Sequence, residues 1–184
     1  MMKSRQGQLL LAAPSLADPN FERSVVLIVQ HTGDGALGLV LNRPTETMLR
    51  DAWEQVADSP CRVDQPVHLG GPCEGPLMLL HSRPDRSQIE VLAGVHFTTE
   101  PDDIAWLLEH HEGALCAFAG YAGWGPRQLE AELRGGSWRL AQGDADLVLH
   151  AGEDLWTQVM NAIDPIEAQL SRNPHLQPPD PSVN

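Results

Sequence analysis

Positive charge is scarce in this sequence. Its 184 residues include 12 lysines and arginines against 25 aspartates and glutamates, which gives a formal net charge of −13. Lys3 is the single lysine, and the arginines are scattered between Arg5 and Arg172. Faces that bind nucleic acid carry clustered lysine and arginine side chains, which neutralise phosphates. The composition therefore disfavours direct binding to nucleic acid, whereas docking onto a basic patch of a partner protein stays open.

Long hydrophobic runs are also missing. The longest, Val25 to Val29 and Leu77 to Leu80, are far too short to cross a hydrocarbon layer about 30 Å thick. The short apolar run at residues 9–13 is closed by Pro14 and does not have the form of a signal peptide. We therefore expect a soluble, cytoplasmic protein with no membrane contact.

Paired cysteines and catalytic motifs are absent as well. Cys61, Cys73 and Cys116 form no CxxC pair, so we expect three reduced thiols, with Cys116 buried. The eight histidines show no HExxH or comparable ligand spacing, and no serine lies in a Gly-x-Ser-x-Gly turn. The sequence therefore assigns no catalytic residue, no metal ligand and no cofactor.

What the sequence does contain is a mixture of short strands and helices, typical of an α+β domain. Helices are expected at about residues 45–57, with Thr45 as the N-cap, at 99–112, from Pro126 to about 134, and at 155–163. Strands are expected at 8–12, 24–31, 36–41, 67–69, 77–81, 88–93, 95–98, 114–121, 138–140 and 147–149. The unbroken apolar strand 24–31 should be covered on both faces. We expect one domain over residues 1–165 and a proline-rich mobile tail at 166–184.

One pair of turns is the first candidate binding site. Asn42–Arg43–Pro44 and Gly70–Gly71–Pro72 each lie at a strand end, where scaffolds often present functional groups. Arg43 could hold a carboxylate or phosphate in a bidentate fork, and the glycines permit close approach of a ligand or another chain. Ordinary turn chemistry explains the same residues, with Asn42 capping the turn and the glycines allowing a tight bend.

The segment Gly120 to Pro126 is the second candidate. Tyr121 and Trp124, followed by Gln128, could form an exposed aromatic patch of the kind found at interfaces. Trp124 could equally fold back into the core. The glycine pattern lacks the lysine of a phosphate-binding loop.

Three segments in this order resemble the AlgH/YqgE family, a bacterial group without an assigned activity. They are 21–28 leading through His31 to the motif at 35–44, Gly70–Gly71–Pro72 leading to Leu80–His81, and 120–130 followed by Glu132 and Trp138. The resemblance covers residues 7 to about 163. It implies a largely antiparallel, barrel-like sheet with three to four helices packed around it, a label as a regulator of transcription, and no catalytic residues.

We therefore expect a non-catalytic binding or regulatory protein that acts through a protein partner or a small ligand at the strand-end turns. One alternative is a hydrolase or transferase whose site is assembled from non-contiguous His, Asn and Arg residues, which requires His31, Asn42 and His81 to converge in one cleft. A direct DNA-binding regulator is a further alternative, disfavoured by the charge. The sequence selects no particular ligand, partner or oligomeric state.

Overall fold

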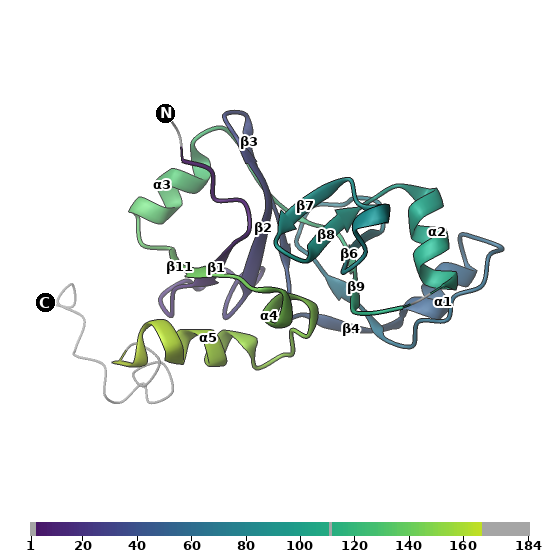
Figure 1. Ribbon diagram of the computed structural model, residues 1–184. Coiled ribbons are helices and arrows are strands. Elements are labelled where there is room, and N and C mark those ends of the chain that lie inside the picture. The colour runs from purple at the N-terminus through teal and green to yellow at the C-terminus, as the bar shows by residue number, and fades with distance from the viewer. Residues whose placement is uncertain (1–2, 111, 167–184) are drawn as a thin grey trace, which may run out of the picture.

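The computed structural model describes residues 3–110 and 112–166. Beyond residue 166, the predicted proline-rich tail lies outside the described residues. Two open sheets lie side by side, and helices pack against both (Figure 1). The predicted α+β class is confirmed, but the single barrel-like sheet is wrong. No helix in the described residues has the length and apolar character needed to cross a membrane.

Sheet A has five strands in the order β10-β3-β2-β1-β11, and all its neighbouring strands are antiparallel. Its members are β1 (Gln8–Ala12), β2 (Val25–Thr32), β3 (Gly35–Val40), β10 (Ala122–Trp124) and β11 (Trp138–Gln142). Sheet A is therefore assembled from two segments, residues 8–40 and 122–142, that lie far apart in the sequence.

Sheet B has six strands in the order β4-β5-β9-β6-β8-β7. The β5–β9 pair is parallel and its other pairs are antiparallel. Its members are β4 (Pro44–Met48), β5 (Pro66–Leu69), β6 (Met78–His81), β7 (Ile89–Leu92), β8 (Val95–Thr98) and β9 (Leu115–Ala119). All of sheet B is thus inserted in the chain between β3 and β10 of sheet A.

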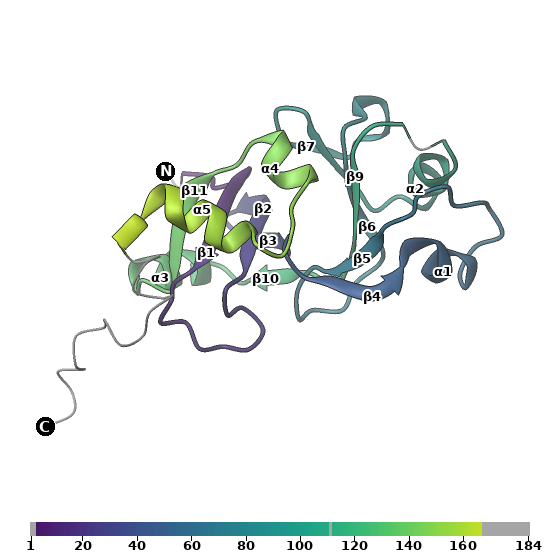
Figure 2. The ribbon, with the colours of Figure 1, turned by 90° about the horizontal axis from the view of Figure 1, so that it is seen from below.

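Five α-helices and one 3-10 turn complete the described residues. They are α1 (Leu49–Glu54), η1 (Pro84–Arg86), α2 (Pro101–Glu109), α3 (Gln128–Arg134), α4 (Ala145–Leu149) and α5 (Leu155–Ile163). Seen from below, α4 and α5 run along sheet A, while α1 and α2 lie on the far side of sheet B (Figure 2).

Three apolar cores hold these layers together. The central core joins side chains of both sheets with α4 and α5. A second core packs α1 and α2 on sheet B, and a third packs α3 on sheet A. Strand β2 shows the pattern clearly: Leu27 faces the central core, whereas Val26 and Ile28 face the α3 side. This confirms the prediction of a strand covered on both faces.

Two predicted elements are wrong. The segment after Pro44 begins as strand β4, because the Thr45 hydroxyl donates to the Val67 carbonyl at 2.7 Å and the chain pairs with β5. Helix α1 then starts only at Leu49. Residues 147–149, predicted as a strand, belong to helix α4, whose N-cap Asp144 accepts a hydrogen bond from the Leu147 N–H at 2.9 Å.

Candidate functional site

The two predicted turns come together on one open pocket of about 480 Å³. Strand β4 pairs with β5, so Arg43 lies beside the turn that follows Leu69. Arg43, Gly71 and Pro72 all line this pocket, which we call the Arg43 pocket. Its remaining lining residues are Asn20, Val40, Leu69, Cys73, Glu74, Gly75, Ala119 and Gly120.

The glycines of the second turn approach another segment of the same chain. A Cβ atom on Gly71, whose φ is +154°, would lie 2.2 Å from the Tyr121 carbonyl carbon. A Cβ on Gly70 would lie 2.3 Å from the Gly120 carbonyl oxygen. Cys73 and Tyr121 exchange backbone hydrogen bonds of 2.9 and 3.0 Å across this junction. Gly70 and Gly71 follow β5 of sheet B, and Tyr121 leads directly into β10 of sheet A. The close approach of these segments therefore joins the two sheets.

Asn42 and Arg43 both hold the loop that precedes β2. The buried Asn42 side chain accepts from the Val25 N–H and donates to the Arg23 carbonyl, both at 2.9 Å. The half-buried Arg43 donates to the backbone carbonyls of Asn20 and Glu22. Asn42 is thus a structural bridge, whereas the Arg43 guanidinium also lines the pocket and has further N–H groups to offer.

In the second candidate segment, Trp124 is only 6% exposed, so it does not form an exposed aromatic patch. Its indole N–H donates to Glu132 Oε2 at 2.9 Å, and Trp138 donates to the same oxygen at 2.8 Å. Gln128 donates to Glu132 Oε1 at 2.9 Å. The segment 120–138, which carried part of the family resemblance, therefore converges on one carboxylate. Tyr121 is half-buried and lies at the sheet junction instead.

Phe21 connects the two candidate regions. Its ring centroid lies 5.4 Å from that of Trp138 and 6.4 Å from that of Trp124. Phe21 lies in the same loop, residues 18–23, whose carbonyls accept from Arg43. This loop therefore separates the Arg43 pocket from a second pocket of about 320 Å³ at the two tryptophans.

The residues proposed for a hydrolase or transferase site do not converge. His31 and Asn42 lie at opposite ends of β2, since His31 pairs with Ala36 while Asn42 binds Val25. At about 3.3 Å per residue, six residues of strand separate these ends by roughly 20 Å. His81 belongs to sheet B, where it pairs with His96. The cleft required by that hypothesis is not formed.

The His31 side chain has a structural role. Its Nδ1 accepts from the Arg5 N–H at 3.0 Å, and its Nε2 lies 3.0 Å from Glu130 Oε1. It therefore ties the N-terminal segment to α3.

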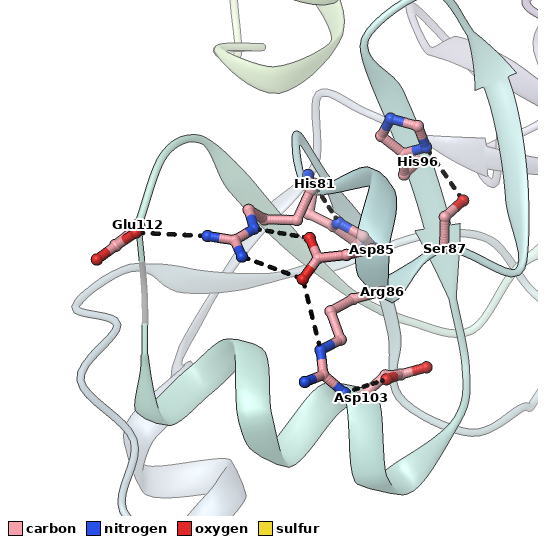
Figure 3. A network of polar contacts seen from close by, with 8 residues as sticks. His81, Asp85, Arg86, Ser87, His96, Asp103 and Glu112 are labelled. Atoms are coloured by element: carbon pink, nitrogen blue, oxygen red, sulfur yellow. Dashed lines mark hydrogen bonds and ion pairs between the residues drawn. The ribbon is translucent and has the colours of Figure 1, made fainter.

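A polar network that sequence reasoning missed lies between β6, η1 and α2 (Figure 3). Arg83 contacts Asp85 at 2.9 and 3.1 Å, and Arg86 contacts Asp103 at 3.2 Å. Both guanidinium groups also lie over the Trp106 ring, at 5.0 and 4.4 Å from its centroid. These charges are mutually compensated, so the network fastens η1 to α2. In the sequence, only the placement of Asp85 between Arg83 and Arg86 hinted at it.

His81 lies beneath this network. It is 1% exposed, and its Nε2 has no hydrogen-bond partner among the described residues. Burial, assisted by the neighbouring His96, lowers the pKa of His81 to about 4. The imidazole is therefore neutral at pH 7. Across the described residues, no group of three or more histidine, cysteine, aspartate and glutamate side chains could hold a metal ion.

Comparison with known proteins places the chain in context. A family described as AlgH-like (DUF179) matches residues 9–166. A UPF0301 protein of Myxococcus xanthus is 37% identical over 178 residues, covering 93% of this chain and 98% of the relative. A UPF0301 protein of Cereibacter sphaeroides is 41% identical over 172 residues, covering 87% and 93%.

Comparison with solved structures supports the same family. The solution structure of AlgH from Pseudomonas aeruginosa superposes with a TM-score of 0.72 at 28% identity, covering 88% of this chain and 92% of that one. A crystal structure from Corynebacterium diphtheriae shares the fold, with a TM-score of 0.74 at 22% identity over 92% and 93% of the chains. The residues that suggested the resemblance, the matched family and the shared architecture all agree, and the chain belongs to the AlgH-like family.

Proposed function

We propose that this protein is a non-catalytic binding or regulatory protein that holds a small acidic ligand in the Arg43 pocket. The observation that carries the proposal is the meeting of two separate turns around one open pocket, with a guanidinium group in its wall. The pocket lies where strand ends of both sheets meet, a position that rigid scaffolds commonly use to present binding groups.

The chemistry of the wall supports a ligand with an acidic head and an apolar body. Arg43 gives two N–H groups to backbone carbonyls and retains others that suit a carboxylate. Leu69 is 46% exposed on the same wall, beside Val40 and Ala119. An exposed leucine in a pocket is a surface that a ligand can cover.

Glu74 limits the charge of this ligand. It is exposed and lines the same pocket as Arg43. A second negative charge on the ligand would be repelled by this carboxylate, so a monoanion such as a carboxylate is favoured over a polyphosphate.

The test is a titration with short aliphatic and aromatic monocarboxylates, followed by ¹H–¹⁵N NMR, with the matching primary amides as neutral controls. Saturable shifts at residues 69–75 with the acids but not the amides are expected. Arg43→Gln and Leu69→Ser should each weaken binding, whereas Arg50→Gln, an exposed arginine of α1, should leave it unchanged. Equal binding of acids and amides, or equal effects of the two arginine variants, would contradict the proposal.

A further inference from the structure

A second pocket, of about 320 Å³, lies on the other side of the loop 18–23 and has a different chemistry. We call it the tryptophan pocket. Its lining includes Asp18, Phe21, Trp124, Gln128, Glu132 and Trp138. The loop before β2 forms one wall, while β10, α3 and the start of β11 form the other.

Among the residues that the structure describes, every charged residue lining the tryptophan pocket is acidic. Asp18 comes from the loop and Glu132 from α3, so the two carboxylates approach the pocket from different walls. The described part of the chain contributes neither Lys nor Arg to this lining. The pocket therefore has a negative potential that the protein's overall charge of −13 reinforces.

Among the described residues, the Glu132 carboxylate has hydrogen-bond donors but no ion-pair partner. Its three partners, the indoles of Trp124 and Trp138 and the amide of Gln128, are all neutral donors. Within residues 3–110 and 112–166, none of the ion pairs includes Glu132. The three donors fix the orientation of the carboxylate and leave its negative charge for a ligand to neutralise.

The aromatic lining of the tryptophan pocket also suits a positively charged ligand. The Phe21 ring meets Trp138 edge to face and is stacked with Trp124. Of these three rings, Phe21 is the most exposed to solvent. Aromatic rings attract organic cations through their negative faces, and combined with carboxylates they form sites for ammonium and guanidinium groups. A phosphate or carboxylate would meet two like charges here.

From this arrangement we infer that the tryptophan pocket binds an organic cation, an alkylammonium or guanidinium group, between Phe21 and the carboxylates of Asp18 and Glu132. The inference is independent of the Arg43 pocket, which selects the opposite charge. Such a cation is available as a small molecule or as a lysine or arginine side chain of a basic peptide.

The direct test is a titration with methylguanidinium chloride, observed through the indole N–H resonances of Trp124 and Trp138. N-methylurea, which is similar in shape and neutral, is the control ligand. We expect saturable shifts of both indole signals with the cation, and none with the urea at the same concentration. A capped tri-arginine peptide forms a second arm: tighter binding than methylguanidinium would identify a basic peptide as the source, and equal or weaker binding a small cation.

Two variants separate this site from general charge effects. Asp18→Asn preserves the side-chain oxygen that accepts from the Asn20 N–H, and Asp34→Asn removes the same charge in the exposed turn between β2 and β3. Asp18→Asn should weaken cation binding about two- to fivefold, the range expected of one exposed charge, and Asp34→Asn should not. Absent indole shifts, equal shifts with N-methylurea, or equal effects of the two variants would overturn the inference. Because Asp18 is exposed and outside the cores, its variant is expected to fold.

Discussion

Trp124 and Trp138 donate their indole N–H groups to the same oxygen of Glu132, at 2.9 and 2.8 Å. One indole comes from β10 and the other from β11, the two edge strands of sheet A. A single carboxylate on α3 thus fastens both edges of the sheet to the helix that covers it.

This arrangement predicts that Trp138→Phe destabilises the fold more than a matched change elsewhere. Trp53 is also buried, but its indole donates to neutral oxygens of Ser59, so Trp53→Phe is the control. Hydrogen bonds to charged groups contribute about 1.5–3 kcal/mol and neutral ones about 0.5–1.5 kcal/mol. Urea unfolding should therefore show the larger loss for Trp138→Phe. Equal losses would mean that the charge of Glu132 contributes nothing.

The junction between the sheets predicts a severe effect of Gly71→Ala. The added Cβ would meet the backbone of Tyr121 and Ala122 at 2.2 to 2.4 Å, and backbone atoms cannot move aside as a flexible side chain can. We expect a loss of more than about 3 kcal/mol, or no folded protein at all. Gly33→Ala is the control, because a Cβ there meets nothing within 4 Å. Circular dichroism and urea unfolding of both variants make the comparison; a stable Gly71→Ala variant would refute the close approach.

The buried His81 predicts a dependence of stability on pH. Its pKa is about 4 in the folded protein and about 6.5 when unfolded, so between these values the unfolded chain binds more protons. The free energy of unfolding should therefore fall as pH decreases from about 6.5 to about 4, by roughly 3 kcal/mol from this residue. Urea unfolding at several pH values should show a shallower decline for His81→Gln. His68, whose pKa burial also lowers, keeps its own contribution in that variant.

The cysteines predict a difference in reactivity. Burial raises the pKa of Cys116 to about 11, and its thiol donates to the Leu149 carbonyl at 3.3 Å. Cys61 and Cys73 are half-buried. An aromatic disulfide reagent at pH 8 should modify two thiols in the native protein and all three in urea, because the thiolate is the reactive form. In the Cys116→Ala variant, the number of modified thiols should stay at two in the native protein and fall from three to two in urea. Three reactive thiols in the native protein would contradict the burial of Cys116.

Sequence patterns predicted elements where local signals were strong. The run at 25–29, the hairpin at Gly94 and helix α5 were all recognisable, because burial on both faces, a turn glycine and helical spacing are local properties. The predictions for residues 45–48 and 147–149 were wrong because the local signals there were outweighed or ambiguous. Pairing of β4 with the distant β5 outweighed a helix-capping threonine, and a three-residue apolar run fits a strand and a helix equally well.

The candidate site was predictable in part. The sequence pointed to Arg43 and Gly71, and the structure places both in one pocket. The sequence could not show that Trp124 is buried, or that Glu132 accepts the indole N–H of Trp124. Those contacts depend on the positions of β10 and β11 as the two edge strands of sheet A. Phe21 drew no attention as a site residue, since an aromatic residue in a loop carries no spacing signal.

The insertion of sheet B between β3 and β10 has a consequence for the order of assembly. On a growing chain, β1 emerges about 130 residues before its partner β11, since Leu10 pairs with Leu140. Closing so long a loop is slow, and until it happens β1 presents an unpaired apolar edge to other chains. Residues 44–119 supply every strand of sheet B and can pair among themselves first. Strand β1, which precedes the other described strands in the sequence, therefore belongs to the last sheet to be completed.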